Sequence, residues 1–192
     1  MSVTAWRKIG KPKIIAQEFV HTVYLQGFED PVNKKVTKFF QIDSIPFCCI
    51  VMPITKDNQV LAIRQFRRAA NKVLLELPGG IPDNPDQSPK EVAENELIQE
   101  TGYKNEILIQ LTSNPIWSEP TILTSPFYPF LALGCQPDEG QKLDNGEYIE
   151  LIKIPLSQWF NHCLNGNIVD CKALATTLLA QNILTKKGIL KL

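Results

Sequence analysis

Residues 75–103 read LELPGGIPDNPDQSPKEVAENELIQETGY, and they decide the fold prediction because they contain the clearest helix start in the chain. Ser88 is a favoured N-cap residue, and Glu91 three positions later completes a capping box. Gly102 suits the left-handed C-cap that ends many helices. The stretch therefore predicts a helix over residues 89–101, placed shortly after a Gly-Gly turn.

Two glutamates, Glu96 and Glu100, lie one turn apart on this predicted helix, with Gln99 beside them. A spacing of four places both carboxylates on the same side of the helix. Two carboxylates aimed at one point form a hard-oxygen site suited to Mg²⁺ or Mn²⁺, and magnesium partners phosphates. The alternative is a solvated helix face, since surface glutamates are common. The Gly-Gly turn, the capped helix and the flanking segments favour a metal-binding site and phosphate chemistry.

The composition is that of an ordinary globular protein. The chain has 192 residues, enough for one domain with a good core, and its 20 lysines and arginines balance 20 aspartates and glutamates. This balance excludes a global field that would attract nucleic acid or an anionic membrane. The five cysteines form no C-x-x-C pair and the two histidines lie far apart, which favours buried reduced thiols over disulfides, zinc ligands or a nucleophile. The N-terminus lacks the apolar core of a signal peptide, and no segment approaches the length of a membrane span, so we expect a cytoplasmic location.

Apolar runs upstream of the turn predict strands. Short apolar pieces within residues 1–44, broken by a turn near Pro31, indicate a β-hairpin or meander. Residues 45–54 form a near-continuous apolar run of strand length, and residues 59–66 follow a polar turn as its partner strand. These two strands are expected to form a central buried pair, and residues 74–77 a further short strand.

The remaining chain mixes strands and helices. Strands are expected at residues 107–111, 127–133 and 148–154, and amphipathic helices at residues 155–163 and 171–184. Strands interrupted by one central helix and closed by helices predict an α/β or α+β sandwich.

The stretch from residue 77 to residue 103 resembles the signature of Nudix hydrolases, G-x5-E-x7-R-E-U-x-E-E-x-G-U, in which U is an aliphatic residue. Four positions near its C-terminal end match, namely Glu96, Leu97, Glu100 and Gly102. The departures are Gln99 for a glutamate, Asn95 for an arginine, Asp86 or Gln87 for the first glutamate, Tyr103 at the last hydrophobic position, and one extra loop residue after Gly80. The resemblance is therefore to a degenerate Nudix box.

Flanking segments extend the resemblance to the ADP-ribose and NDP-sugar pyrophosphatase branch of the family. The similar segments are residues 64–67, 75–80, 146–150 and 166–170. The resemblance implies a Nudix-like α/β/α sandwich with a mixed central sheet over residues 45–192. Residues 1–44 would form an N-terminal β-hairpin extension, a candidate dimerisation element of a homodimer.

The resemblance also implies a set of metal ligands. Glu96 and Glu100 would bind the ion with the backbone carbonyl of Gly79, a residue whose lack of a side chain lets the backbone approach. Gln99 would coordinate through its amide oxygen or position a water, but it brings no charge. We therefore expect weaker or fewer bound metal ions than three carboxylates would hold. Asn95 is expected to hydrogen bond Asp86 or Gln87 and so replace the family's bracing pair.

A polar, acidic loop after the box is expected to supply the general base, as it commonly does in the related pyrophosphatases. Glu147 is the first candidate and Glu139 the second. For either residue the alternative is a mobile solvated loop.

Substrate contacts are expected from a cluster of arginines, because a guanidinium grips phosphate oxygens with two bonds. Arg64 and Arg67, with Arg68, are candidates for the diphosphate, and salt bridges to neighbouring acids are the alternative. Glu76 would bind the ribose or base, or else pair with Arg67. Trp117 would stack on an adenine or form the exposed edge of a core.

The function implied by this resemblance is Mg²⁺-dependent hydrolysis of the diphosphate bond of ADP-ribose or an NDP-sugar. The products would be a nucleoside monophosphate and a sugar phosphate. The alternative is a catalytically weak or inactive Nudix domain that binds a nucleotide or a protein, and the charge lost at Gln99 supports it. The flanking segments disfavour an enzyme that cleans oxidised nucleoside triphosphates.

Overall fold

The computed structural model describes residues 3–43 and 45–190. The chain forms two compact units, Met1–Pro46 with Trp117–Pro126, and Phe47–Ile116 with Phe127–Leu192. The first unit holds an antiparallel sheet and the second holds a mixed sheet with helices.

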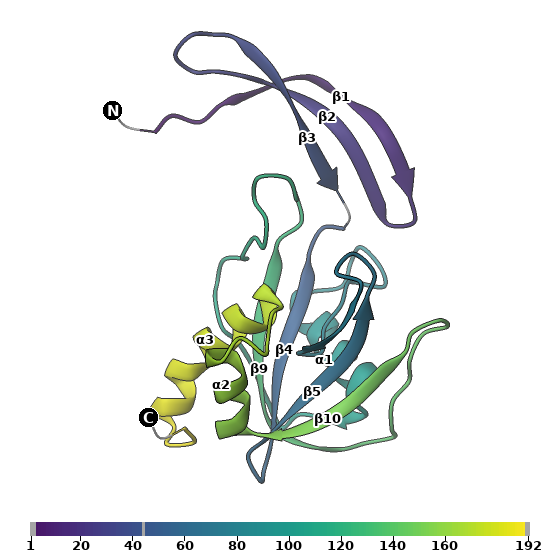
Figure 1. Cartoon of the computed structure of the whole chain (residues 1–192), viewed down its shortest axis with the longest axis vertical. Coiled ribbons are helices and arrows are strands. Elements are labelled where there is room, and N and C mark those ends of the chain that lie inside the picture. Colours follow the sequence, from purple (N-terminus) through teal and green to yellow (C-terminus); the bar gives the residue numbers. More distant parts are fainter. Residues whose placement is uncertain (1–2, 44, 191–192) are drawn as a thin grey trace. The chain divides into compact units, whose positions relative to one another are not determined.

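The first unit is a three-stranded meander of β1 (Arg7–Glu18), β2 (His21–Glu29) and β3 (Val36–Asp43) (Figure 1). The expected turn follows β2, where the Asp30 carboxylate accepts the N–H groups of Val32 and Asn33. Residues 117–126 also belong to this unit, because the N–H of Ile42 donates to the Ile122 carbonyl at 2.8 Å. The division expected at residue 44 had placed that segment in the second unit.

The second unit contains a seven-stranded sheet in the order β10-β5-β4-β9-β7, with β6 paired to β5 and β8 to β9. Its strands are β4 (Cys48–Thr55), β5 (Gln59–Arg67), β6 (Lys72–Glu76), β7 (Tyr103–Lys104), β8 (Ile107–Gln110), β9 (Phe127–Pro137) and β10 (Ile149–Pro155). Its helices are α1 (Pro89–Thr101), α2 (Leu156–Leu164) and α3 (Cys171–Lys186).

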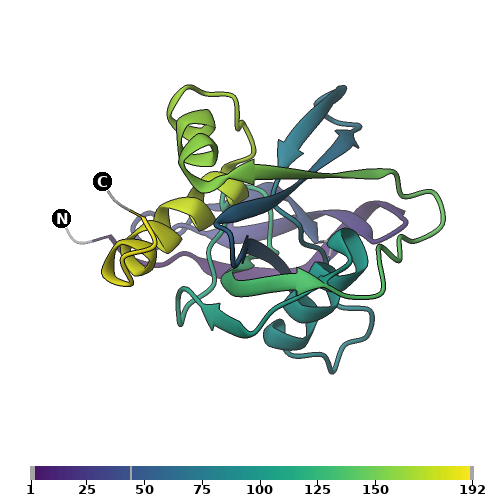
Figure 2. The same ribbon diagram turned by 90° about the horizontal axis from the view of Figure 1, so that it is seen from below.

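The central strand β4 is apolar throughout because both of its faces are buried. Cys49 and Val51 pack into the cluster that includes Leu97 of α1. Ile50 and Met52 point the other way, into the cluster formed with α2 and α3. The helices therefore cover opposite faces of the sheet, and the expected α/β/α sandwich is confirmed (Figures 1 and 2).

The pairing of β4 differs from the sequence expectation. Its contact with β5 has a single Cα partner pair, Ile54 with Val60, beside the turn that joins them. Along most of its length β4 instead pairs in parallel with β9, from Cys48 with Phe127 to Thr55 with Cys135. β10 pairs with β5 from Gln59 to Gln65, whereas β6 pairs with the outer end of β5, from Ile63 to Arg67. This arrangement carries β5 and β6 to one end of the sheet, beside the Gly-Gly turn.

All five cysteines are free thiols, as expected. Cys49 and Cys135 are buried, whereas Cys171 is exposed, so burial does not extend to every thiol. Burial raises the pKa of Cys135 to about 12, which makes it a poor nucleophile. Among the described residues no helix is long and apolar enough to cross a membrane.

Candidate active site

The helix α1 carries the predicted carboxylates, and its ends form as the sequence indicates. The Ser88 hydroxyl accepts the N–H of Glu91, and the Glu91 carboxylate accepts the N–H of Ser88 at 2.8 Å. At the other end Gly102 adopts φ 72° and donates its N–H to the Ile98 carbonyl. These caps fix where α1 begins and ends, and with them the positions of Glu96 and Glu100.

The Gly-Gly turn lies between β4 and α1. The carbonyls of Pro78 and Gly80 accept the N–H groups of Val51 and Cys49. Gly79 lies between them, and its N–H donates to Oε2 of Glu100 at 2.6 Å. Within the described part of the chain, no hydrogen bond reaches the Gly79 carbonyl. That oxygen is therefore free to act as a ligand.

Of the two glycines in the turn, Gly79 is required by a close approach to backbone, and Gly80 lies against a side-chain carboxylate. A Cβ on Gly79 would lie 2.2 Å from the backbone oxygen of Cys49, which cannot yield without moving β4. A Cβ on Gly80 would lie 2.2 Å from Oε1 of Glu96. The missing side chains thus let the turn contact the helix carboxylates directly.

Both carboxylates, those of Glu96 and Glu100, have raised pKa values. Burial raises the pKa of Glu96 to about 7, with further contributions from the charges of Glu147 and Asp83. Burial likewise raises the pKa of Glu100 to about 8, helped by the charge of Glu96 and opposed by the hydrogen bond from Gly79. Two buried like charges favour protonation unless a cation lies between them.

This arrangement fits a divalent cation. Glu96, Glu100 and the Gly79 carbonyl supply oxygen ligands of the kind that Mg²⁺ and Mn²⁺ prefer. Among the described residues, no group of three or more histidine, cysteine, aspartate or glutamate side chains could hold a metal ion. The described residues thus offer two carboxylates at this turn, and neutral oxygens such as that of Gln99 or water would have to complete the coordination of an ion.

The loop after β9 is anchored on the last turn of α1. The N–H of Lys142 donates to the Gln99 carbonyl at 2.8 Å, and Nε2 of Gln141 donates to the Glu100 carbonyl at 2.6 Å. The N–H of Asp138 donates to the Gly102 carbonyl at 2.8 Å. These donors satisfy carbonyls that the end of a helix leaves unpaired. The loop thereby gains a fixed position next to the carboxylates.

The two general-base candidates on this loop have different surroundings. The charge of Glu147 raises the pKa of both Glu96 and Glu100, so its carboxylate lies within electrostatic reach of the pair. Glu139 instead forms an exposed ion pair with Lys142 at 2.6 Å. Of the two candidates, Glu147 is therefore the one whose charge acts on Glu96 and Glu100.

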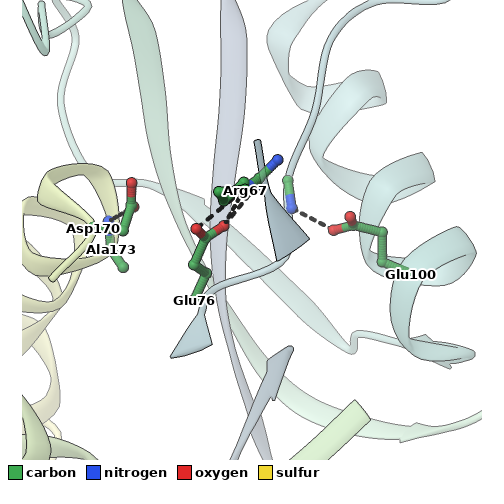
Figure 3. A network of polar contacts seen from close by, with 6 residues as sticks. Arg67, Glu76, Glu100, Asp170 and Ala173 are labelled. Atoms are coloured by element: carbon green, nitrogen blue, oxygen red, sulfur yellow. Dashed lines mark hydrogen bonds and ion pairs between the residues drawn. The ribbon is translucent and has the colours of Figure 1, made fainter. Parts of the chain in front are cut away.

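Arg67 and Glu76 form the strongest ion pair near the site. The Glu76 side chain is only 4% exposed, and it accepts Nη2 of Arg67 at 2.6 Å and Nε at 2.9 Å (Figure 3). Burial lowers the pKa of Arg67, but the hydrogen bond and charge of Glu76, with Glu100 and Asp170, outweigh it and raise the pKa. Asp170 also caps α3 by accepting the N–H of Ala173. Of the two roles weighed for Glu76, the structure shows the pairing with Arg67.

The other residues expected to contact the substrate or brace the loop have different partners in the structure. Arg64 pairs with Glu150 at 3.4 Å on the surface, which is the alternative weighed for the arginines. Trp117 belongs to the first unit, where its Nε1 donates to the Thr124 carbonyl. Gln87, rather than Asn95, braces the loop before α1, because its Oε1 accepts the N–H of Asp83.

Three aspartates near the site were missed by the sequence analysis. Asp83 and Asp144 act on the pKa of Glu96, and Asp170 acts on that of Arg67. Asp83 and Asp144 lie in polar turns, and only the N-cap position of Asp170 gave a local signal.

Comparisons with known proteins agree with this geometry. No protein-family model matches the chain. It is 25% identical over 167 residues to an ADP-ribose pyrophosphatase of Bacillus subtilis (strain 168), covering 86% of this chain and 87% of that protein. It is 27% identical over 150 residues to a methanol dehydrogenase activator of Bacillus methanolicus, covering 76% of each.

The chain is also similar to a third relative and to a solved structure. An uncharacterised Nudix hydrolase of Schizosaccharomyces pombe is 32% identical over 121 residues, covering 60% of this chain and 57% of that protein. A crystal structure of an ADP compounds hydrolase superposes with a TM-score of 0.82 at 18% identity, covering 99% of this chain and all of that one. The chain is thus similar to an ADP-ribose pyrophosphatase and to a Nudix hydrolase, and it shares the fold of an ADP compounds hydrolase.

Proposed function

We propose that the protein hydrolyses the diphosphate bond of a nucleoside diphosphate derivative, ADP-ribose or an NDP-sugar, to a nucleoside monophosphate and a sugar phosphate. The reaction depends on Mg²⁺ or Mn²⁺. The observation that carries the proposal is the pair of buried carboxylates, Glu96 and Glu100, held against the Gly79 turn. Relatives named ADP-ribose pyrophosphatase and Nudix hydrolase support the substrate class.

Glu96, Glu100 and the Gly79 carbonyl hold the ion in this proposal, and Gln99 adds a neutral oxygen. A bound divalent ion neutralises phosphate charge and activates water. Glu147 accepts the proton of the attacking water at its carboxylate, since the anchored loop holds it near the pair. Arg67, oriented by Glu76, contacts the diphosphate with the part of its guanidinium that Glu76 leaves free.

A matched pair of variants tests the carboxylate role. Glu100→Gln removes a charge from the site, whereas Glu94→Gln removes one from a surface ion pair with Lys90 on the same helix. We expect Glu100→Gln to lower metal-dependent kcat by at least about 100-fold and Glu94→Gln to leave it unchanged. Equal activity of the two variants on ADP-ribose would remove the basis of the proposal.

A substrate panel distinguishes the remaining candidates. The panel contains ADP-ribose, several NDP-sugars and dinucleoside polyphosphates, each with and without Mg²⁺ or Mn²⁺. Turnover confined to ADP-ribose or the NDP-sugars is the expected result. Nucleotide binding without turnover on any of them would instead identify a binding module, the alternative that the charge lost at Gln99 supports.

We further propose a cytoplasmic homodimer that uses the first unit. The five free thiols suit a reducing compartment. The meander exposes aromatic side chains that include Phe19, Phe39 and Phe40, and a sheet of this size has little core of its own.

A further inference from the structure

Of the three donors that anchor the loop over residues 138–148 on the end of α1, Gln141 is the one that uses its side chain. The other two are the main-chain N–H groups of Asp138 and Lys142, which almost any residue could supply. Gln141 instead uses its side-chain amide, whose Nε2 donates to the Glu100 carbonyl at 2.6 Å. This contact therefore depends on which amino acid occupies position 141.

The same Nε2 also contacts the far end of the loop. It lies 3.5 Å from the carbonyl oxygen of Ile149, the first residue of β10. A side-chain amide has two N–H donors, so one glutamine can donate to both carbonyls. The bond to Glu100 is short, whereas the bond to Ile149 is long and weak. Gln141 thus links the last turn of α1 to the start of β10, two residues after Glu147.

Glu147 lies in the segment that Gln141 closes, and its own hydrogen bonds are local. Its N–H donates to the Asp144 carbonyl at 3.0 Å, and its Oε2 accepts the Asp144 N–H at 3.3 Å. Among the described residues, no hydrogen bond or ion pair joins the Glu147 carboxylate to α1. The position of this carboxylate relative to α1 therefore depends on how the loop is anchored.

We propose that Gln141 is a positioning residue that holds the loop over residues 138–148, and with it Glu147, against the end of α1. This proposal rests on the proposed function, in which Glu147 accepts the proton of the attacking water. The carbonyl that Gln141 binds belongs to Glu100, whose carboxylate holds the ion in that function. The anchor therefore fixes the base relative to the metal site, and Gln141 acts through Glu147 rather than on the substrate.

Amide hydrogen exchange measured by NMR tests the anchor without requiring turnover. Gln141→Met keeps the length of the side chain and removes both N–H donors. We expect the amides of Asp138 and Lys142 to exchange roughly fivefold faster in this variant, because losing a hydrogen bond favours local opening of the loop. Gln158→Met is the matched control, since Gln158 is exposed on α2 and outside the loop, and it should exchange as the wild type does. Unchanged exchange in Gln141→Met would overturn the proposal.

A double-mutant cycle with Glu147→Gln tests whether Gln141 acts through the base. With ADP-ribose, Gln141→Met should lower kcat about tenfold and leave KM unchanged, because the variant displaces the base and not the substrate contacts. Gln158→Met should keep both values. In the Glu147→Gln background, Gln141→Met should lower kcat no further, since the group that Gln141 positions is already gone. Equal fold-losses in the two backgrounds would overturn the positioning role.

The two measurements separate the anchor from the proposed reaction. If the wild type hydrolyses ADP-ribose and Gln141→Met changes neither amide exchange nor kcat, the anchor is wrong and the reaction stands. If the wild type hydrolyses no diphosphate but the amides of Asp138 and Lys142 exchange faster in Gln141→Met, the reaction is wrong and the anchor stands.

Discussion

At Glu100 two requirements of the site meet in one side chain. Its carboxylate is 3% exposed and accepts the Gly79 N–H, which fixes the turn against the helix. The same burial raises its pKa to about 8, and the negative charges of Glu96 and Glu147 raise the pKa further. A divalent cation bound beside Glu100 would offset this burial and repulsion and favour the ionised carboxylate.

The raised pKa values predict how pH changes the stability of the metal-free protein. Glu96 and Glu100 have pKa values of about 7 and about 8 in the folded state, against an ordinary value of 4.5. The folded state therefore keeps these protons after the unfolded chain has lost them. Their contribution to the free energy of unfolding is fully present below pH 4.5 and is lost as the pH rises through about 8.

Urea unfolding in EDTA at pH 6 and pH 9 checks this sign. The wild type should lose more stability over this interval than Glu100→Gln, which has no carboxylate at that position. Mg²⁺ should restore much of the loss at pH 9. Parallel pH profiles for the two proteins would contradict the assigned pKa shift.

Gln99 predicts a second change at this scale. Its side chain lies on α1 beside Glu100, and Gln99→Glu would add a third carboxylate at the position where the family signature has one. We expect the Mg²⁺ concentration for half-maximal activity to fall, because a third negative charge binds the cation more strongly. A metal titration of ADP-ribose turnover measures this. An unchanged or higher requirement would show that the missing charge is not what limits metal binding.

At the scale of elements, the loop over residues 138–148 and the C-terminal end of α1 act as one piece. Three donors of the loop satisfy the carbonyls of Gln99, Glu100 and Gly102. A Cβ on Gly102 would lie 2.6 Å from the carbonyl carbon of Gly140, so the glycine also allows the loop to approach. Because Glu147 follows on the same loop, this anchoring places the candidate base.

Gly102→Ala and Gly166→Ala separate backbone strain from the loop contact. Both glycines have φ 72° after a helix, but nothing lies within 4 Å of the Cβ position of Gly166. Each alanine should therefore cost about 1 kcal/mol of stability from the left-handed conformation. Gly102→Ala should cost more and also lower kcat, because the loop must move. Denaturant unfolding with ADP-ribose kinetics measures both effects, and equal stability and activity of the variants would contradict a tight loop anchor.

Many of the helices and strands were predictable from local sequence. The strand pairings were not, and they share one physical cause. The ends of α1 followed from Ser88, Glu91 and Gly102, since capping is decided by residues a few positions apart. The apolar run of β4 likewise showed that both faces are buried. Its parallel pairing with β9 was not foreseen, because the partner lies about eighty residues later in the chain.

The candidate site was predictable to the same extent. The spacing of Glu96 and Glu100 on one helix face is local and could be read from the sequence, whereas the role expected of Gly79 came from the resemblance to the family signature. The Arg67–Glu76 pair was left open, because a hairpin between β5 and β6 had to form before its geometry existed.

At the scale of the whole molecule, the two units differ in how much apolar surface they bury. The second unit has two buried hydrophobic clusters, one on each face of its sheet. In the first unit, the described part of the meander buries Gln26, whose Nε2 donates to the Ile9 carbonyl at 3.0 Å, while Phe19, Phe39 and Phe40 stay exposed. Such a sheet gains stability by covering those side chains.

We predict that a second copy of the chain covers these exposed side chains in a homodimer. Sedimentation equilibrium at micromolar concentration should give a mass about twice the 21.7 kDa of one chain. Phe40→Lys should shift the equilibrium toward monomer, because Phe40 is 54% exposed on β3. Leu178→Lys on α3, 68% exposed, is the matched control and should remain dimeric. A monomeric wild type would contradict the prediction.

The central claim is that a Nudix box with two carboxylates still runs metal-dependent hydrolysis. Phosphorus NMR of ADP-ribose incubated with the purified wild type tests it most directly, in Mg²⁺ and in EDTA. The account predicts equal amounts of AMP and ribose 5-phosphate in Mg²⁺ and intact ADP-ribose in EDTA. Intact ADP-ribose in Mg²⁺ and in Mn²⁺, from protein that binds it, would contradict the claim.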